Sequence, residues 1–304
     1  MEKFKFKISA TGLSVNYLPE YLAEVLGYFD EVGLEVSSYV PSPWTQVLKD
    51  IDSGEYCCVV GGIWVPLVYK RLREYRAFAK VSSRCPLVLV SRTPVDRFDW
   101  KHLEGKTVLV SGGNGASPGL FVAGCAKEGG ADMSKIHFVH DFTAPMLAEG
   151  FQAGWGDIVV LKSDLAAQIA AAGKGYVAAD LTRHGGQVPW SVYYALPEFL
   201  TRRDNLAGRF VLALQKATTW LLAHDGEACR EILSRNWPKL PIEKAVEMVD
   251  MFRREGMWDA TVDIKENELN RWQTFLAEGR VIDKSYRYEE IVDATAFRYA
   301  SEHL

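Results

Sequence analysis

The stretch NYLPEYLAEVLGYFDEVGLEV, residues 16–36, decides what kind of fold this chain can adopt. Leu18 and Leu22 begin an apolar stripe at helical spacing. Pro19 suits a first helical turn, where the missing N–H group costs nothing. Gly27 is a natural end for that helix, because glycine enters left-handed backbone conformations without steric penalty. The stretch therefore predicts a compact helix that stops at a sharp turn.

Strands are expected on both sides of this helix. After a second stop at Gly33, apolar residues resume with near-alternate spacing over residues 34–40, as in a strand. Before the helix, residues 4–8 (FKFKI) alternate between apolar and basic side chains. The opening of the chain is thus predicted to run strand, loop, helix, strand.

The same alternation of strands and helices continues through the first two-thirds of the chain. Continuous apolar runs predict buried parallel strands at 56–60, 87–90, 107–110, 136–139, 158–161 and 176–179. Helices are predicted between them at 44–52, 118–128, 144–153 and 164–172. From residue 204 onward the chain is expected to be helical, over 206–224, 227–236, 242–255, 265–278 and 288–302. This pattern is typical of an α/β fold with right-handed crossovers.

Length and composition narrow the class of protein. The 304 residues correspond to about two domains. A hydrophobic content of 48% and a charged content of 24% fit a globular protein with a substantial core. A net charge of −4 provides no basic footprint for nucleic acid. No apolar run approaches the roughly 20 residues of a membrane helix, so no membrane insertion is expected.

The cysteines and the first residues bear on the compartment. The five cysteines are odd in number, and the adjacent Cys57 and Cys58 are poorly placed to bridge each other. Oxidising compartments usually select against loose thiols, which favours the cytoplasm. Residues 1–7 lack the apolar core and cleavage site of a secretory signal. Two locations stay open: the cell envelope if an export segment was removed, and the cytoplasm if Met1 is the native start.

Several segments resemble the type II periplasmic binding proteins that take nitrate, sulfonates, taurine and thiamine-pyrimidine precursors. The turn Gly27-Tyr28-Phe29 and the following 33–36 (GLEV) resemble the opening of that family. Residues 103–108 (LEGKTV) resemble the entry to its second domain, and 111–119 resemble its loop of small residues. Residues 149–157 resemble the step before a buried strand.

This resemblance implies a two-lobed α/β fold with a small-molecule site in a cleft between the lobes. Each lobe would be a mostly parallel sheet flanked by helices, and the C-terminal region would be helical. Lobe one is expected at 1–91 and 192–304, and lobe two at 92–191. The crossing segments are expected near 90–93 and 188–193, with the C-terminal helices packed on lobe one.

The loop 111–119 follows a predicted strand and opens a predicted helix. Its glycines let backbone N–H groups approach a ligand, and a helix N-terminus favours negative charge. Asn114 and Ser117 are placed to add side-chain hydrogen bonds. The alternative is an ordinary tight turn in which Ser117 caps the helix and Pro118 occupies its first position.

Aromatic residues follow the strands of lobe one. Gly62 and Trp64 come directly after the strand at 56–60, at the sheet edge where open α/β folds place their ligands. Trp44 sits at the equivalent edge after the strand at 34–40, and Trp190 lies near the return crossing, where it would face Trp44 across the cleft. Paired aromatic side chains suit a planar or apolar ligand. The alternative is that each tryptophan simply packs in the core.

Together with the family resemblance, these positions give a predicted set of ligand contacts. From lobe one the set comprises Asn16, Tyr17, Trp44, Gly62 and Trp64, with Trp190 at the return crossing. From lobe two it comprises Asn114, Ser117, Asp141 and Lys162. The ammonium of Lys162 would suit an anionic ligand group, whereas the alternative is a solvated surface lysine.

The sequence contains no recognisable metal or cofactor motif. His137 and His140 are three residues apart, without the paired cysteines or the His-x-x-x-His spacing of a metal site. No Gly-x-Ser-x-Gly nucleophile elbow occurs. We therefore expect no metal and no cofactor.

Two enzymes share the fold that the resemblance implies: the sulfinate desulfinase of dibenzothiophene breakdown and the yeast-type pyrimidine synthase of thiamine biosynthesis. Ser14 falls where the desulfinase has its cysteine, and Val59 replaces its arginine. The pair Cys57-Cys58 is too short for the iron-binding run of the synthase. Neither activity transfers to this chain.

Another enzymatic use of the same cleft stays open. Ser14 is the best-placed candidate nucleophile, with His140 as its base and Asp141 as the orienting group. A serine before a helix is more often a cap or a hydrogen-bond donor.

The leading interpretation is therefore a solute-binding component of an ABC-type importer or a relative of one. A small organic molecule would be its ligand and an ABC permease its partner, and the protein would be a monomer or weak dimer. The alternative is a cytosolic enzyme, a lyase, hydrolase or biosynthetic enzyme, that acts on a small aromatic or heterocyclic compound.

Overall fold

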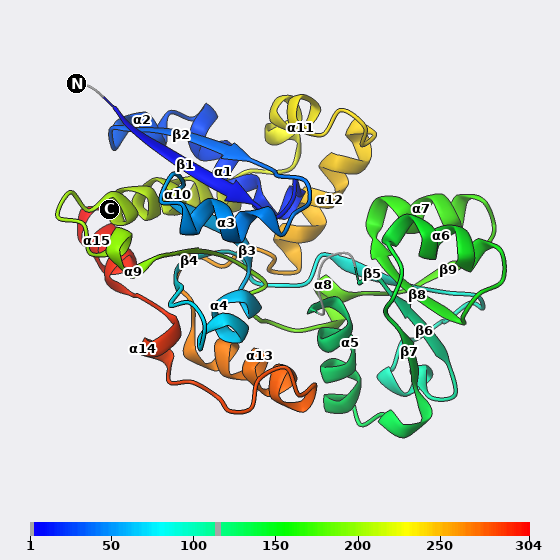
Figure 1. The fold of residues 1–304 in the computed structure, drawn as a ribbon. Coiled ribbons are helices and arrows are strands. Elements are labelled where there is room, and N and C mark those ends of the chain that lie inside the picture. Colours follow the sequence, from blue (N-terminus) through cyan, green and yellow to red (C-terminus); the bar gives the residue numbers. More distant parts are fainter. Residues whose placement is uncertain (1–2, 113–116) are drawn as a thin grey trace. The chain divides into compact units, whose positions relative to one another are not determined.

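A computed structural model describes residues 3–112 and 117–304 of the chain (Figure 1). The chain divides into two compact units. Unit 1 comprises Met1–Ser83, Val188–Asn270 and Lys284–Leu304, and unit 2 comprises Arg84–Gln187 and Arg271–Asp283. Across the described residues, no helix is both long enough and apolar enough to cross a membrane.

Unit 1 is built on a five-stranded sheet with the order β2-β1-β3-β10-β4. Its strands are β1 (Phe4–Ala10), β2 (Leu34–Tyr39), β3 (Cys58–Gly62), β4 (Arg76–Ser82) and β10 (Ser191–Ala195). β1 pairs in parallel with β2 and β3, whereas β10 runs antiparallel to both β3 and β4. Four strands therefore share one direction and only β10 opposes them.

The opening of the chain folds as its sequence predicts. Helix α1 (Leu18–Val25) ends at Gly27, whose φ of 77° requires glycine, and the short helix α2 (Tyr28–Glu31) follows. Gly33 then turns the chain into β2 with a φ of 69°. The side chain of Leu18 is fully buried against the sheet. The strand, helix and strand of the opening are confirmed.

Unit 2 repeats this plan with different strands. The sheet order is β7-β6-β8-β5-β9. Its strands are β5 (Leu87–Ser91), β6 (Thr107–Val110), β7 (His137–Val139), β8 (Ile158–Lys162) and β9 (Tyr176–Asp180). β6 is parallel to β7 and β8, and β5 is antiparallel to β8 and β9. Again four strands share one direction, so the expectation of two mostly parallel sheets is confirmed.

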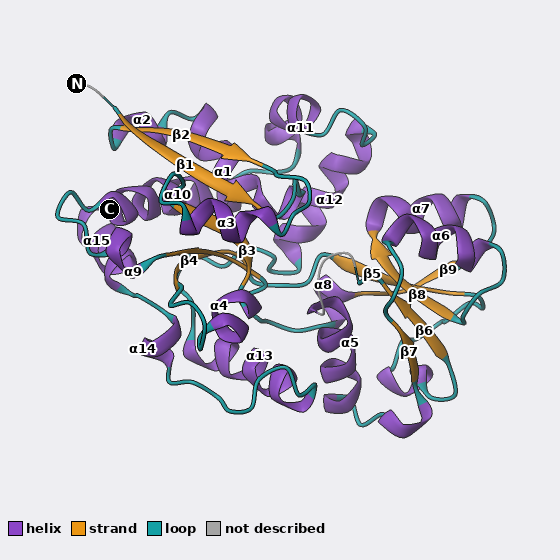
Figure 2. Cartoon of the chain, in the orientation of Figure 1, coloured by secondary structure: helices purple, strands orange, loops and turns teal. Residues whose placement is uncertain are grey.

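Helices flank each sheet (Figure 2). The shorter helices that follow strands in unit 1 are α3 (Gln46–Asp52), α4 (Trp64–Tyr69) and α9 (Pro197–Leu200), and those in unit 2 are α5 (Ser117–Glu128), α6 (Ala144–Gln152), α7 (Ser163–Ala171) and α8 (Leu181–His184). The C-terminal third supplies α10 (Leu206–Ala223), α11 (Arg230–Asn236), α12 (Ile242–Arg254), α13 (Glu266–Glu278), α14 (Tyr288–Ile291) and α15 (Thr295–His303). α10 helps form the core of unit 1, where Phe210 stacks on Phe6 with ring centroids 4.7 Å apart.

Two strands of unit 1, β4 and β10, were missing from the sequence-based prediction. β4 interrupts its apolar run with Lys80, a side chain that is 2% exposed because acidic partners far along the chain neutralise it. The predicted single helix at 288–302 is also wrong. It splits into α14 and α15 because the N–H of Asp293 donates to the carbonyl of Ala77 in β4.

The predicted lobe boundaries differ from the observed division. The chain leaves unit 1 after Ser83 rather than after residue 91, because β5 pairs with β8 and β9 in the sheet of unit 2. The return falls at Val188 rather than at residue 192. Residues 271–283 also belong to unit 2. The ring of Trp272 packs edge-on against that of Phe121 in α5, with the ring centroids 5.6 Å apart. The expectation that all C-terminal helices join lobe one is therefore wrong.

Candidate functional site

The carboxyl ends of the parallel strands in unit 1 form a continuous edge, which we call the unit 1 edge. It comprises four segments that follow or end the parallel strands, 11–17, 40–46, 61–64 and 82–83, and the segment that leads into the antiparallel β10, 188–191. The register brings distant segments together, because Ser191 of β10 pairs with Gly62 of β3 and with Ser82 of β4. Open α/β sheets place their ligands at such an edge.

Two tryptophans form an aromatic corner at the unit 1 edge. The rings of Trp44 and Trp64 lie 6.1 Å apart and meet at 72°. A β-carbon on Gly62 would lie 2.4 Å from Cδ1 of Trp64, so the indole rests directly on the glycine backbone. Trp44 and Trp64 are both half-buried, which leaves part of each ring accessible. Sequence reasoning placed these three residues at one site, and the structure brings them together.

The loop after β1 is held by its own polar side chains. The Ser14 hydroxyl donates to the Asn16 side-chain oxygen, and Asn16 Nδ2 donates to Ser82 Oγ at 3.0 Å. Tyr17 OH and Thr11 Oγ1 lie 3.5 Å apart. The Asn16 side chain is only 2% exposed, so its polar atoms are occupied inside the protein. A ligand contact from Asn16 or Tyr17 stays a prediction.

The unit 1 edge contains no charged residue. None of its five segments includes Asp, Glu, Lys, Arg or His. Its polar groups are neutral, and they include the hydroxyls of Thr11, Tyr17, Ser82 and Ser191. Sequence reasoning missed Thr11, Ser82 and Ser191. A polar residue directly after β1 was a usable signal for Thr11, whereas the two serines enter through the unrecognised strands β4 and β10.

Unit 2 has an equivalent edge of different chemistry. Ser111 and Gly112 follow β6, His140 and Asp141 follow β7, and Lys162 ends β8. The backbone N–H of Gly112 donates to the carbonyl of Phe142 at 3.2 Å, which ties the first two loops together. A β-carbon on Gly112 would lie 2.2 Å from the carbonyl oxygen of His140. Of the predicted unit 2 contacts, Asp141 and Lys162 thus lie at one edge of the sheet.

Three of the four predicted ligand contacts of unit 2 are described, and they have different environments. Asn114 lies outside the described residues. Ser117 is buried in the first turn of α5, and Asp141 and Lys162 are exposed. Their contact with a ligand stays a prediction.

His140 packs against the start of α5. A β-carbon on Gly119 would lie 2.4 Å from its ring, and the ring stacks on Phe138 at a centroid distance of 5.7 Å. Burial lowers the pKa of His140, although the neighbouring charge of Asp141 acts in the opposite direction. The imidazole is therefore biased towards its neutral form.

The candidate catalytic residues do not come from one unit. Ser14 belongs to unit 1, whereas His140 and Asp141 belong to unit 2. The Ser14 hydroxyl donates to an amide oxygen, which is not a base, so Ser14 acts as a hydrogen-bond donor in this structure. Trp44 and Trp190 both belong to unit 1, and an arrangement in which they face each other across a cleft stays a prediction.

The cysteines are held as thiols. Burial raises the pKa of Cys58 and Cys85 well above its ordinary value and that of Cys125 and Cys229 to about 12. Burial also raises the pKa of the half-buried Cys57. Within residues 3–112 and 117–304, no group of three His, Cys, Asp or Glu side chains is placed to hold a metal ion.

The family model described as NMT1/THI5 like matches residues 14–228, more than two-thirds of the chain and all of the unit 1 edge except residues 11–13. This chain belongs to the NMT1/THI5-like family. The match includes the helix-and-turn stretch at 16–36 and every strand of the two sheets except β1. The resemblance to type II periplasmic binding proteins is thereby confirmed.

Relatives of this NMT1/THI5-like chain include binding proteins and an enzyme. "Putative binding protein YtlA" of Bacillus subtilis (strain 168) is 24% identical over 299 residues, which cover 95% of this chain and 87% of that protein. The solved structure of the periplasmic sulfonate-binding protein SsuA from Methylobacillus flagellatus KT has a TM-score of 0.73 at 14% identity, covering 99% of this chain and 95% of the other. The desulfurization enzyme DSZB has a TM-score of 0.65 at 14% identity, covering 99% of both chains. The structural matches show a shared two-lobed fold, which is compatible with both binding and catalysis.

Proposed function

We propose that this protein captures a small organic molecule at the unit 1 edge and serves an ABC-type import system as its solute-binding component. The observation that carries the proposal is the combination of the Trp44–Trp64 corner with an edge that contains no charged residue. Flat apolar surfaces with a few neutral hydroxyls are typical of small-molecule sites. An ABC permease is the partner that this function requires.

The same edge favours an uncharged, flat ligand group. The two half-buried indoles offer stacking surface, and the Thr11 hydroxyl, which donates to the Val60 carbonyl, retains a lone pair that accepts a hydrogen bond from a neutral polar atom. A charged group buried there would lose its hydration without gaining an opposite charge. We therefore infer that the part of the ligand held by unit 1 is uncharged.

Binding without turnover is favoured over catalysis by the state of the candidate nucleophiles. Ser14 donates to the Asn16 amide oxygen, and burial raises the pKa of the five thiols. YtlA and SsuA are described as binding proteins, which supports ligand capture. The desulfurization enzyme DSZB shows that the same fold also occurs in enzymes. Recovery of the ligand after incubation separates the two functions.

A thermal-shift screen tests the proposal directly. The panel contains uncharged heteroaromatic compounds, alkanesulfonates, taurine and nitrate, because a ligand that binds only the native state raises the unfolding temperature. We expect an uncharged flat compound to raise it, to quench tryptophan fluorescence, and to be recovered unchanged by mass spectrometry. Stabilisation by nitrate or small sulfonates alone would contradict the ligand class. Conversion of the bound compound would replace capture with catalysis.

A further inference from the structure

A segment from the C-terminal third of the chain covers the outer edge of β4. Helix α12 ends at Gly256, whose φ is 73°, and the N–H of Met257 donates back to the carbonyl of Phe252 at 2.8 Å. A glycine in the left-handed conformation after the last turn is a common C-terminal cap of a helix, and it turns the chain sharply. The following residues, 257–262, form what we call the β4 strap.

The β4 strap is hydrogen-bonded at one end to β4 and at the other to Ser83, the residue that follows β4. Ser83 donates its N–H to the carbonyl of Met257 at 2.8 Å, and Lys80 donates its N–H to the carbonyl of Val262 at 2.7 Å. From the other side, Gln215 of α10 accepts from the Val262 N–H at 3.0 Å. Because β4 is the last strand of its sheet, the strap supplies partners that an edge strand would otherwise lack.

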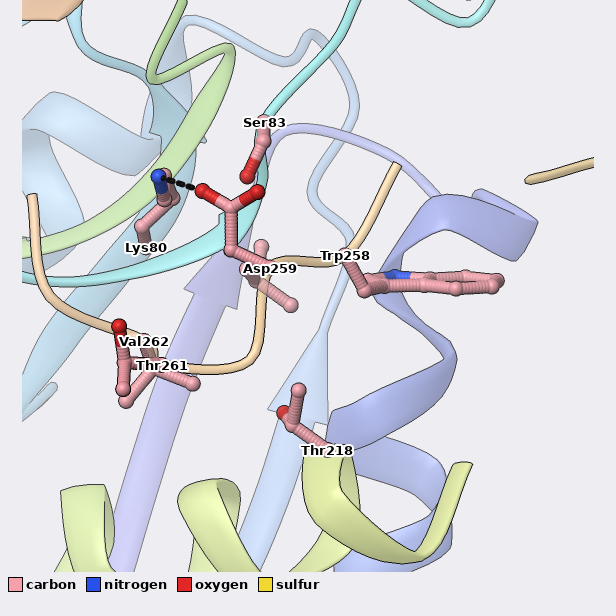
Figure 3. Close-up of a pocket in the computed structure, with 8 residues that line it drawn as sticks. Lys80, Ser83, Thr218, Trp258, Asp259, Thr261 and Val262 are labelled. Carbon is pink, nitrogen blue, oxygen red and sulfur yellow. Dashed lines mark hydrogen bonds and ion pairs between the residues drawn. The ribbon is translucent and has the colours of Figure 1, made fainter. Parts of the chain in front are cut away.

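A buried ion cluster fixes the middle of the strap, and Figure 3 shows its Lys80–Asp259 pair. Lys80 Nζ lies 2.6 Å from a carboxylate oxygen of Asp259 and 2.6 Å from one of Glu268, and Lys265 approaches Asp259 at 3.4 Å. Lys80 and Glu268 are each 2% exposed. Burial alone would raise the pKa of Asp259, but the charge and hydrogen bond of Lys80 hold it below its ordinary value. The cluster therefore anchors residue 259 firmly.

Trp258 precedes this anchor and points away from it (Figure 3). Its indole Nε1 donates to the backbone carbonyl of Asn16 at 3.0 Å, and its ring is 3% exposed against Phe252 of α12. The hollow beside Trp258, lined also by Lys80 and Thr218, has a volume of about 10 Å³, room for roughly one water molecule. The indole therefore has little freedom to leave the Asn16 carbonyl.

We propose that Trp258 is a positioning residue for the ligand loop at 11–17. Asn16 is held at its side chain by Ser82 and at its backbone by Trp258, so both contacts depend on β4 and its strap. The strap thereby sets where Tyr17 and the loop hydroxyls stand at the unit 1 edge. The meaning of this inference for binding rests on the proposed function, but its test needs no ligand.

Hydrogen–deuterium exchange of the ligand-free full chain provides that test. Trp258→Phe keeps an aromatic ring and removes only the indole donor to Asn16. Losing one buried hydrogen bond should speed amide exchange at 11–17 by about 2- to 10-fold, with little change in a peptide covering β1. Trp237→Phe is the matched control, because the Trp237 indole N–H is buried and meets no acceptor within the described chain.

The outcomes separate a positioning role from general packing. Equal acceleration across unit 1, or the same pattern in Trp258→Phe and Trp237→Phe, would overturn the proposal. If Trp258→Phe does not fold, Asp259→Asn carries the test, because it weakens the anchor while keeping the side-chain size. Unchanged exchange at 11–17 in that folded variant would equally contradict a positioning strap. Failure of the ligand screen leaves this result unaffected, so the two proposals fail independently.

Discussion

The two sheets of this protein share one plan and differ in the chemistry of their carboxyl edges. Each has five strands, four in one direction, with the opposing strand next to last in the order. The unit 1 edge is uncharged and aromatic, whereas that of unit 2 carries His140, Asp141 and Lys162. Topology therefore fixes where loops gather, and the side chains in those loops decide what each edge can bind.

Glycines show the same contrast in more detail. In unit 1, Gly62 makes room for the side chain of Trp64. In unit 2, Gly112 makes room for the backbone carbonyl of His140. The first glycine lies against a half-buried ring, and the second lets two loops approach each other. The predictions that follow test this contrast.

Lys80→Met should cause the largest loss of stability. It leaves the carboxylates of Asp259 and Glu268 buried without their cation, a change that costs about 3–5 kcal/mol. Lys162→Met is the control in unit 2, because Lys162 is exposed and should change stability by less than about 0.5 kcal/mol. Urea unfolding measures both variants. A similar small loss for each would refute a structural role for the buried cluster.

Trp44→Ala and Trp64→Ala should each weaken ligand binding by about 1–3 kcal/mol if the rings stack on the ligand. Isothermal titration with the compound selected in the thermal-shift screen measures the effect. Trp155→Ala serves as the control. This half-exposed tryptophan precedes β8, so it lies at the amino end of that strand and not at the carboxyl edge. Unchanged affinity in folded Trp44 and Trp64 variants would assign both rings to packing alone.

Gly112→Ala should mainly lower stability, whereas Gly62→Ala should mainly change ligand binding and tryptophan fluorescence. The new methyl at 112 meets a backbone oxygen and should destabilise the protein by about 1–3 kcal/mol, because two loops must shift. The methyl at 62 meets an indole that can rotate, so stability should fall less, with a change in tryptophan fluorescence and weaker binding. Gly12→Ala is the control, because a methyl there has no atom within 4 Å. Equal stability losses at 62 and 112 would contradict the distinction.

His140 should produce the smallest effect, a pH dependence of stability. Burial lowers its pKa in the folded protein below the unfolded value of about 6.5, so the unfolded chain binds the proton more readily. Stability should be full above about pH 6.5, should fall as the pH drops towards the folded pKa, and should then level off. His140→Gln should flatten this part of the profile in urea unfolding. Identical profiles for the parent chain and for His140→Gln would contradict the assignment.

Much of the fold followed from local patterns in the sequence. The helix at 18–25, the glycines at 27 and 33 and the strand at 107–110 were predictable, because periodicity and left-handed backbone geometry are properties of a few neighbouring residues. β4 was not predictable in this way. From local sequence, Lys80 is expected at the surface. It is buried because Asp259 and Glu268, about 180 residues later in the chain, neutralise its charge.

Some features of the candidate site were likewise predictable from local sequence, and others were not. The sequence by itself determined that Gly62, Trp64, His140 and Lys162 end or follow strands, since parallel strands finish at a common edge. Only the tertiary structure decided that Trp44 and Trp190 share a unit, that Ser82 and Ser191 join Gly62, and that Trp258 bonds the Asn16 carbonyl. Strand order and strap docking depend on pairings between segments up to 242 residues apart. Such pairings are chosen by packing and buried hydrogen bonds, which leave no local repeat in the chain.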